Sequence, residues 1–384
     1  MVHIFVFAFD LTEASQIRRI KSLQKLDYHV QSAAFRRANM NADFVPDWQN
    51  TDLGFVANER YGNRLIGILR GIRRVMQDRT ALRRADVIMA RNLDLLVIAW
   101  VSRWLAGAGR VPLVYECLDI HKLFTTPGFA GSLMRWCERQ LLARIQLLVV
   151  SSPGFITHYF KTMQDYRGPH RIIENKLWFD GKVCARPKVR SIKAADAAIH
   201  LGWVGSIRCA PSLRLLMAAA DHFEGRINVR IHGNVHRHAL PDFDEQILQR
   251  ANVTYFGPYK YPTGLASVYA DCDVVWAQDL WQRGANSDWL LPNRIYEASW
   301  FGCPSIAVEG TETGRKVAKD SLGFTVTEPS AGALIRCLEG MSKNAVAKVS
   351  NDLLAKDDTD FVLRPQDVKL ALEPVLPNTV KARP

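Results

Sequence analysis

The sequence is poor in cysteine, and the cysteines it has are scattered. Seven cysteines occur in 384 residues, at least twenty positions apart and without a C-x-x-C pair. This spacing excludes a disulfide framework and a closed zinc site, and it favours reduced thiols in a cytosol.

Signals for export or membrane insertion are also missing. The opening MVHIFVFAFD has no basic region, and Asp10 ends its apolar run early. The longest apolar stretches, 95–101 and 147–150, are far shorter than the roughly 20 residues that cross a bilayer. We therefore expect a cytoplasmic protein without a transmembrane helix.

The glycine fingerprint G-x-G-x-x-G of dinucleotide-binding folds is absent as well. The first strand-like run is followed by FDLTEAS, and the second half opens with Gly202 and Gly205. A nicotinamide or flavin enzyme is therefore disfavoured.

What the sequence does contain is an ordinary globular composition. Hydrophobic residues make up 48% and charged residues 23%, and the length suits two domains. Short apolar runs alternate with helical periodicity, which predicts parallel sheets built from βαβ units. The predicted strands are 3–9, 28–35, 87–90, 113–117, 147–151, 171–173, 200–204, 228–232, 253–256, 274–277 and 305–308, and the predicted helices are 15–26, 93–106, 130–145, 211–222, 263–269, 292–301 and 330–343.

The predicted fold class is α/β, with two Rossmann-like doubly wound parallel-sheet domains facing each other across a cleft. A polar, basic stretch without apolar periodicity interrupts the alternation. It divides the chain into a first domain at 1–180, a linker at 181–198, a second domain at 199–360 and a C-terminal extension at 361–384, whose return to the first domain is left open. Ligands of open α/β sheets bind beyond the carboxyl ends of the strands, so we expect the site there.

The excess of basic charge is confined to the first half. Residues 1–190 hold 29 Lys and Arg against 16 Asp and Glu, whereas residues 191–384 hold 21 against 22. A basic field attracts nucleic acid, anionic lipid and phosphorylated substrates alike, so the asymmetry indicates a polyanion-facing half without naming its partner. A genomic bias toward arginine is the alternative.

One basic segment has the pattern of a membrane-surface helix. Between 60 and 84 the chain has eight arginines and one acidic residue, with apolar residues on a helical stripe. Arginines beside an apolar stripe suit a helix on an anionic membrane, and an ordinary half-buried helix fits equally well. The predicted membrane-facing residues are Arg70, Arg73, Arg74, Arg83 and Arg84.

Two segments of the second half have the pattern of an anion site. In LGWVGSIRCAPSLRLL a strand meets a glycine turn, and Arg208 precedes a helix, which together suit a diphosphate. In PNRIYEASWFGCPSIAVEGTETG, Asn293 and Arg294 open a helix that carries Glu297. One carboxylate that accepts from two vicinal hydroxyls is how α/β folds often hold a ribose. A plain turn at Arg208 and a solvent-facing Glu297 are the alternatives.

The second of these segments resembles the donor-site helix of bacterial glycosyltransferases with the two-domain GT-B architecture, above all glycosyltransferase family 4 and its succinoglycan-type exopolysaccharide-assembly relatives. The segments LVYECLDIH, LGWVGSIR and VTYFGPYKYPTGLASVYADCDVVWA match in order, so the resemblance spans most of the chain. It implies transfer of a hexose from a UDP- or GDP-type nucleotide sugar to a lipid-linked saccharide, at the inner face of the plasma membrane. The base, sugar, linkage, acceptor and oligomeric state stay open.

The resemblance also implies roles for single residues. Glu297 is expected to bind the ribose, Gly205 and Arg208 to face the diphosphate, and the turn 257–259 to lie beside the base. Family 4 enzymes often carry a glutamate eight residues before the ribose glutamate, where this chain has Trp289. This departure leaves retention or inversion of the anomeric configuration open, with Asp288 as the candidate substitute. The predicted nucleotide-sugar-binding residues are Gly205, Ser206, Arg208, Gly233, Tyr259, Asp288, Asn293, Arg294 and Glu297.

The resemblance places the acceptor and the catalytic group at strand ends of the first domain. An inverting enzyme needs a base within hydrogen-bond reach of the acceptor hydroxyl. The candidates are Asp119, which is the first choice, Glu116, His121 and Asp10, and turn capping is the alternative for each. A retaining enzyme relies instead on the donor phosphate and on backbone groups near the sugar.

No cofactor and no metal are predicted. Asp119 with His121, and His232 with His236 and His238, lack the spacing of a closed zinc site. Arginines and helix dipoles are expected to neutralise the diphosphate. Two other functions stay open: a sugar-nucleotide epimerase of GT-B architecture, and a basic nucleic-acid-binding protein, for which recognition motifs are missing.

Overall fold

The chain forms two compact units. The computed structural model describes residues 1–37, 44–55, 64–179, 184–190 and 198–377. The N-terminal unit contains residues 1–174 together with 364–384, and the C-terminal unit contains residues 175–363. Of the predicted linker, 181–183 and 191–197 lie outside the described residues. The intervening 184–190 belongs to the C-terminal unit, where Arg186 Nη2 donates to the Leu353 carbonyl at 2.6 Å.

A seven-stranded sheet forms the centre of the N-terminal unit. Its order is β3-β2-β1-β4-β5-β6-β7, and every neighbouring pair is parallel. All residues of β4, β5 and β6 are buried, which explains their continuous apolar runs, because helices cover parallel sheets on both faces. The strands are β1 (His3–Ala8), β2 (His29–Arg36), β3 (Gln49–Phe55), β4 (Val87–Arg91), β5 (Leu113–Cys117), β6 (Leu147–Val150) and β7 (His170–Ile172).

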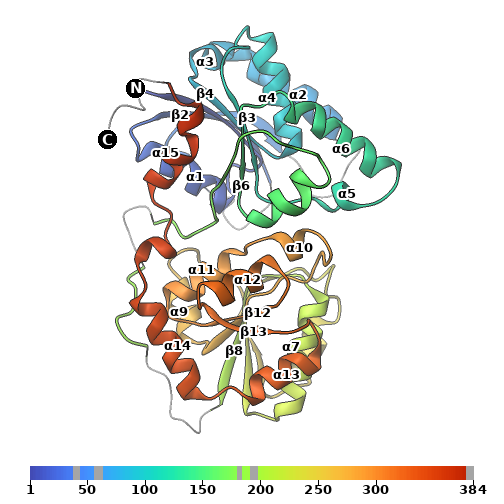
Figure 1. Cartoon of the computed structure of the whole chain (residues 1–384), viewed down its shortest axis with the longest axis vertical. Helices are drawn as coiled ribbons and strands as arrows, with labels where there is room; N and C mark the ends of the chain where they lie inside the picture. The colour runs from blue at the N-terminus through green and yellow to red at the C-terminus, as the bar shows by residue number, and fades with distance from the viewer. Residues whose placement is uncertain (38–43, 56–63, 180–183, 191–197, 378–384) are drawn as a thin grey trace. The chain divides into compact units, whose positions relative to one another are not determined.

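Helices lie on both faces of this sheet (Figure 1). On one face α4 packs against α2 and α6, and on the other α15 packs against α1. The last of these contacts ties a C-terminal helix to the N-terminal unit. The helices are α1 (Ala14–Gln24), α2 (Arg64–Gln77), α3 (Arg79–Arg84), α4 (Asn92–Leu105), α5 (Lys122–Thr125), α6 (Phe129–Leu142), the π-helix η2 (Phe155–Lys161), α15 (Pro365–Leu372) and the 3-10 helix η4 (Glu373–Val375).

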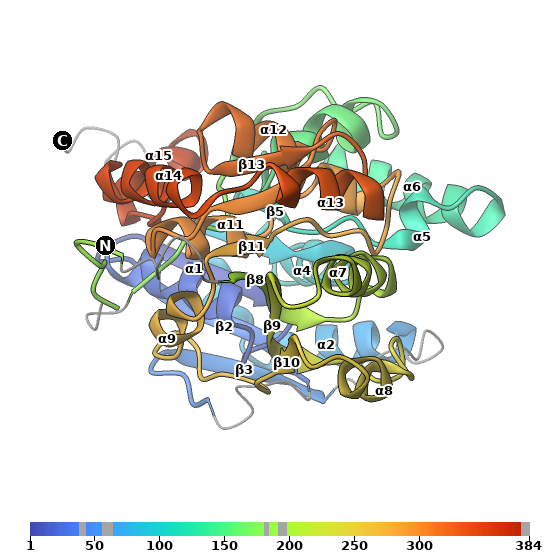
Figure 2. The same cartoon turned by 90° about the horizontal axis from the view of Figure 1, so that it is seen from below.

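The C-terminal unit has its own parallel sheet of six strands. The order is β10-β9-β8-β11-β12-β13. Figure 2 shows α8 beside β10 at one edge. Two parallel sheets covered by helices confirm the predicted α/β class. The strands are β8 (Ile199–Ile207), β9 (Ile227–Val235), β10 (Val253–Tyr255), β11 (Val274–Trp276), β12 (Ser305–Val308) and β13 (Gly323–Val326).

Two hydrophobic cores flank this second sheet. One is formed with α7 and α13 and includes Trp203 and Trp276, and the other is formed with α9, α11 and α14 and includes Tyr269 and Tyr296. The helices are α7 (Ala210–Phe223), α8 (Phe243–Leu248), α9 (Leu265–Ala270), α10 (Asn286–Trp289), α11 (Asn293–Trp300), α12 (Glu312–Lys319), α13 (Ala331–Glu339), α14 (Lys343–Ala355) and the 3-10 helix η3 (Asp358–Asp360). Within the described part of the chain, no helix combines the length and apolarity needed to cross a bilayer.

Candidate functional site

Two glycines bring the carboxyl ends of β8 and β9 into direct contact. Gly205 has φ +108° and Gly233 has φ +139°, conformations that side chains disfavour. A Cβ on Gly233 would lie 1.8 Å from the Gly205 carbonyl oxygen, so only glycine fits there. The Gly233 N–H donates to the Gly257 carbonyl beyond β10, at 2.8 Å. These contacts hold the ends of β8 and β9 and the turn after β10 close together.

Helix α11 directs a cation toward these glycines. Asn293 is its first residue, and Arg294 Nη2 lies 3.8 Å from the position that a Cβ on Gly205 would occupy. The amino end of a helix carries partial positive charge, which adds to the guanidinium. The structure thus brings Arg294 close to Gly205 and its neighbour Gly233, with Asn293 at the same helix end, and this arrangement suits an anion.

One helical turn after Arg294, Glu297 is buried rather than solvent-facing. Glu297 is only 6% exposed, and its Oε2 accepts a hydrogen bond from Tyr269 Oη at 3.1 Å. Burial, and then the Glu297 charge, raise the pKa of Tyr259, whereas Arg294 opposes the rise. Glu297, Tyr259 and Arg294 therefore lie within electrostatic reach of one another. A carboxylate oriented in this way suits recognition of hydroxyl groups.

The loop after β8 holds a second arginine. Arg208 Nη2 lies 3.9 Å from Asp279 Oδ2, and its guanidinium lies 5.9 Å from the Trp281 ring centroid. Ser206 lies near the end of β8, and its Oγ is 2.9 Å from Nε2 of His236, which follows β9. The sequence identified Ser206 and Arg208, but it noted His236 only as part of a histidine cluster without metal spacing.

A cavity of about 310 Å³ adjoins the carboxyl ends of β12 and β13. Asp288 is among its acidic residues, and its Oδ2 accepts from the Gly284 N–H at 2.8 Å. Gly310 and Thr311, which directly precede α12, also line the cavity, so the amino end of that helix adjoins it. The lining residues are Leu280, Arg283, Asp288, Val308, Glu309, Gly310, Thr311, Thr327, Glu328 and Pro329.

Gln278, which sequence reasoning missed, fixes the loops around this cavity. Its buried amide oxygen accepts from the Val308 N–H and from Thr311 Oγ1, both at 3.1 Å. Its amide nitrogen donates to the Asp279 carbonyl at 3.0 Å. Its position as a polar residue directly after the apolar run VVWA is the signal that could have identified it.

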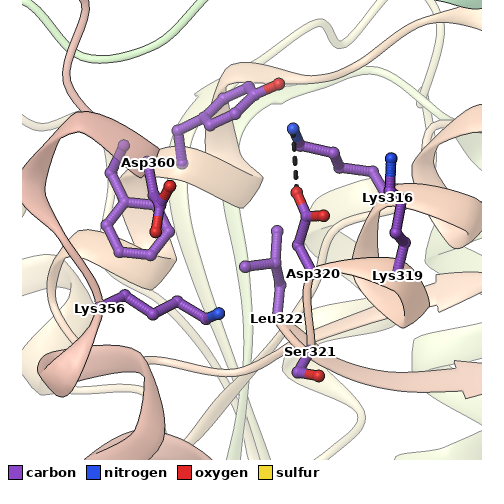
Figure 3. A pocket seen from close by; sticks show the side chains of 9 residues that line it. Lys316, Lys319, Asp320, Ser321, Leu322, Lys356 and Asp360 are labelled. Carbon is purple, nitrogen blue, oxygen red and sulfur yellow. Dashed lines mark ion pairs between the residues drawn. The ribbon is translucent and has the colours of Figure 1, made fainter.

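A second cavity, of about 280 Å³, lies at the other end of α12 (Figure 3). Figure 3 shows Lys316 paired with Asp320, at 3.0 Å, and Lys356 extending toward the same space. These residues flank the amino end of β13, opposite to the strand ends where α/β sheets bind ligands. We therefore place the candidate site at the first cavity and the glycine turns.

In the N-terminal unit, Glu116 is a buried ion-pair residue. Its carboxylate bonds Arg19 Nε at 2.7 Å and Arg91 Nη2 at 2.8 Å. Although burial alone would raise the pKa of Glu116, the charges of Arg91 and Arg19 lower it to about 2. A carboxylate that holds its charge this firmly is a poor proton acceptor, so the environment favours a structural role.

The other candidate catalytic residues lie in turns. Asp10 is buried, and its Oδ1 accepts from the Thr12 N–H and Oγ1. His121 caps α5 through an Nδ1 that accepts from the Leu123 N–H at 3.2 Å. Asp119 is exposed after β5. Burial lowers the pKa of the nearby Arg91 guanidinium, and the carboxylates of Glu116, Glu13 and Asp119 together raise it. The role of Asp119 as the catalytic base, the first choice from the sequence, stays a prediction.

The arginines predicted to face a membrane have different environments. Arg70, Arg73, Arg83 and Arg84 are exposed, whereas Arg74 is half-buried and its Nη1 donates to the Asp52 carbonyl at 2.8 Å. Arg83 Nε donates to the Ala106 carbonyl at 2.6 Å. No group of three His, Cys, Asp or Glu side chains within the described residues is arranged to hold a metal ion.

Comparison with known proteins establishes the family. The chain is 32% identical over 384 residues to the succinoglycan biosynthesis protein ExoL of Rhizobium meliloti (strain 1021), covering 100% of this chain and 95% of ExoL. Residues 19–172 also match the family described as Glycosyl transferase 4-like domain. The chain belongs to the ExoL-related glycosyltransferases. This membership confirms the resemblance that the donor-helix segment indicated, and it sets aside the epimerase and nucleic-acid-binding alternatives.

Solved structures show the same fold as this ExoL-related glycosyltransferase. Anabaena Alr3699/HepE in complex with UDP matches with a TM-score of 0.68 at 17% identity, over 97% of this chain and 100% of that one. Sucrose-phosphate synthase of Thermosynechococcus elongatus matches with a TM-score of 0.69 at 13% identity, over 98% and 96%. The predicted GT-B architecture is thereby confirmed.

Proposed function

We propose that this glycosyltransferase moves a sugar from a nucleotide-diphosphate sugar of the UDP or GDP type to a lipid-linked saccharide in exopolysaccharide biosynthesis. The observation that carries the proposal is that Arg294 reaches Gly205, which is paired with Gly233 at the strand ends, while Glu297 lies buried one helical turn further along α11. Two relatives support it: ExoL is a succinoglycan biosynthesis protein, and HepE has been crystallised with UDP and with UDP-glucose.

In this proposal each part of the donor has its own partners. The diphosphate lies on the Gly205 and Gly233 backbone, between Arg208 and Arg294, and the ribose hydroxyls donate to Glu297. Tyr259 and its turn lie beside the base, and the transferred sugar enters the 310 Å³ cavity beside Asp288. As the bond from the anomeric carbon to the diphosphate breaks, negative charge grows on the diphosphate, and the two arginines and the α11 amino end stabilise it. No metal and no cofactor take part.

The acceptor hydroxyl is proposed to bind at the N-terminal unit near Asp119. An exposed carboxylate after β5 can reach a bound hydroxyl and take its proton, which an inverting reaction requires. Glu116, the last residue but one of β5, instead fixes the end of this strand through its ion pairs with Arg19 and Arg91.

A lipid-linked acceptor calls for attachment to the inner membrane face, and the surface of the N-terminal unit supports it. On α6, Phe129, Leu133 and Trp136 lie on one helical face and are 82%, 45% and 55% exposed. The one acidic residue of α6, Glu138, is buried, whereas Arg139 of the same helix is exposed and Arg135 is half-buried. Aromatic and basic side chains on one helix suit an anionic lipid interface.

Thermal unfolding with a nucleotide panel tests the proposal. UDP or GDP is expected to raise the melting temperature, because a ligand that binds the native state stabilises it. A short RNA serves as the control and is expected to have no effect. Incubation with radiolabelled sugar nucleotides and a bacterial lipid extract then identifies the sugar and the acceptor. Absence of a shift with every nucleotide would overturn the proposal.

A further inference from the structure

The Ser206–His236 pair lies at the same strand ends as the proposed diphosphate site. Ser206 directly follows Gly205, and its Oγ is 2.9 Å from His236 Nε2. The His236 N–H donates to the Ile207 carbonyl at 2.9 Å, which fastens the segment after β9 to the end of β8. A side-chain and a main-chain hydrogen bond therefore hold His236 against the end of β8, next to Gly205.

The charges around His236 are mostly positive. From the β8 side the neighbours are Ser206 and Arg208, and from its own segment the neighbour is His238, whose ring centroid is 5.6 Å away. Asp279 is 3.9 Å from Arg208, which makes it a weak counter-ion for the group. The adjacent Arg237 is paired with Asp244 at 2.8 Å. A dianionic group placed here would meet donors and cations on both sides.

We propose that Ser206 and His236 form a proton-linked part of the diphosphate site, in which His236 takes a proton from solvent as the nucleotide diphosphate binds. The inference rests on the proposed function. Ser206 is the positioning residue, since its hydroxyl holds Nε2 of the ring, and His236 becomes a third cation beside Arg208 and Arg294. The same proton then helps to stabilise the charge that develops on the leaving diphosphate.

The direction of the proton transfer follows from the surroundings. Burial, the Arg208 charge and His238 lower the pKa of His236 below its ordinary value, so the free enzyme holds a neutral imidazole at pH 7. A bound diphosphate favours the charged form and raises that pKa. The affinity for the nucleotide diphosphate therefore rises as the pH falls from the pKa of His236 in the complex to its pKa in the free enzyme. For one proton, the rise is at most about tenfold per pH unit.

Calorimetric titration with UDP tests this coupling. Wild-type protein is titrated between pH 6.5 and 8.5 in pairs of buffers with different ionisation enthalpies, which yields the number of protons taken up. We expect net uptake near pH 7 for the wild type and none for His236→Gln, whose UDP affinity falls about tenfold at pH 6.5 and little at pH 8.5. The phosphate of UDP also titrates in this range, and subtracting the proton uptake of the variant from that of the wild type removes this contribution.

Two further variants locate the effect. Ser206→Ala is expected to weaken UDP binding and to keep proton uptake, and His222→Gln, a histidine paired with Glu339 at 3.2 Å, is expected to match the wild type. Equal proton uptake in wild type and His236→Gln overturns the inference, as does loss of uptake in His238→Gln alone. UDP and GDP binding that is absent at every pH overturns the proposed function instead, so the two failures are distinguishable.

Discussion

The carbonyl oxygen of Gly205 lies 1.8 Å from the point where a Cβ on Gly233 would stand. The two strand ends are in contact at a spacing that only glycine allows. We expect Gly233→Ala to push β8 and β9 apart, to destabilise the protein by about 3 kcal/mol through strain and overpacking, and to weaken UDP binding at least tenfold. Thermal unfolding and calorimetric titration measure the two effects.

Gly225→Ala is the matched control for this substitution. Gly225 also has a positive φ, +99°, but a Cβ there would meet nothing within 4 Å. The control therefore reports backbone strain without the steric clash, and we expect it to keep UDP affinity. Equal loss of binding in both variants would contradict the role assigned to the Gly205–Gly233 contact.

Glu297→Gln tests recognition of the ribose. The amide keeps the shape of the side chain and can still accept from Tyr269 Oη, but it loses the charge. Hydrogen bonds to charged groups contribute about 1.5–3 kcal/mol, so UDP affinity is expected to fall about 10- to 150-fold with little change in fold. Tyr269→Phe, which removes only the orienting hydroxyl, is expected to cost less. Wild-type affinity in Glu297→Gln would refute the assignment.

Asp119→Asn tests the proposed base. A general base typically contributes a factor of about 10² to 10⁴, so the transfer rate is expected to fall by that amount while UDP affinity stays unchanged. Asp165→Asn, an exposed acid of the same unit paired with Arg167, is the control. A full transfer rate in Asp119→Asn would assign the base elsewhere or favour a retaining reaction.

Glu116→Gln tests the buried ion pair in the N-terminal unit. Loss of the carboxylate leaves Arg19 and Arg91 buried without their partner, which is expected to cost about 3–5 kcal/mol of stability at pH 7. The folded-state pKa of Glu116, about 2, lies below its ordinary value of 4.5. Its stabilising contribution is therefore complete above pH 4.5 and is lost as the pH falls toward 2.

Melting temperatures across this pH range measure the linkage. The wild type should lose stability on acidification more steeply than Glu116→Gln, so the two curves converge at low pH. Parallel curves would show that the carboxylate does not titrate with a lowered pKa.

The exposed face of α6 is expected to bind anionic vesicles. A triple substitution of Phe129, Leu133 and Trp136 by serine removes apolar side chains worth about 1.5–3 kcal/mol each when buried, so sedimentation with phosphatidylglycerol vesicles should fall more than tenfold. Leu248→Ser is the control, because Leu248 is 86% exposed on α8 of the other unit. Replacing Arg70 and Arg73 by glutamate tests α2 separately, and unchanged sedimentation in both variants would discard the membrane face.

The sheets were largely predictable because buried parallel strands are apolar throughout. β5 and β12 begin and end at the predicted residues, 113–117 and 305–308. β3, QNTDLGF, was missed because it is a polar edge strand, and α12 was missed because few of its residues are buried. The predicted helix at 330–343 corresponds to α13, which ends at Glu339, whereas α14 begins at Lys343 and was not predicted; a serine caps the start of each helix.

Long-range partners explain most of what the sequence did not reveal about the site. Glu116 looked like a strand-end acid, but its partner Arg19 is 97 residues away and Arg91 is 25 residues away. Ser206 and His236 are separated by 30 residues and meet only because β8 and β9 are adjacent. The segment with Gly205 and Arg208 and the helix with Arg294 and Glu297 were recognisable because their characteristic residues are close together in the sequence. The predicted roles of these residues await the experiments above.

The return of α15 to the N-terminal unit has a consequence for biosynthesis. The chain leaves that unit after residue 174 and contributes to it again from residue 364, where Val368 and Leu372 are buried. Multidomain chains commonly complete their domains in order as the ribosome releases them. Here the C-terminal unit has its whole sequence available earlier, and the sheet that is made first acquires the covering helix α15 only after the C-terminal unit has been synthesised.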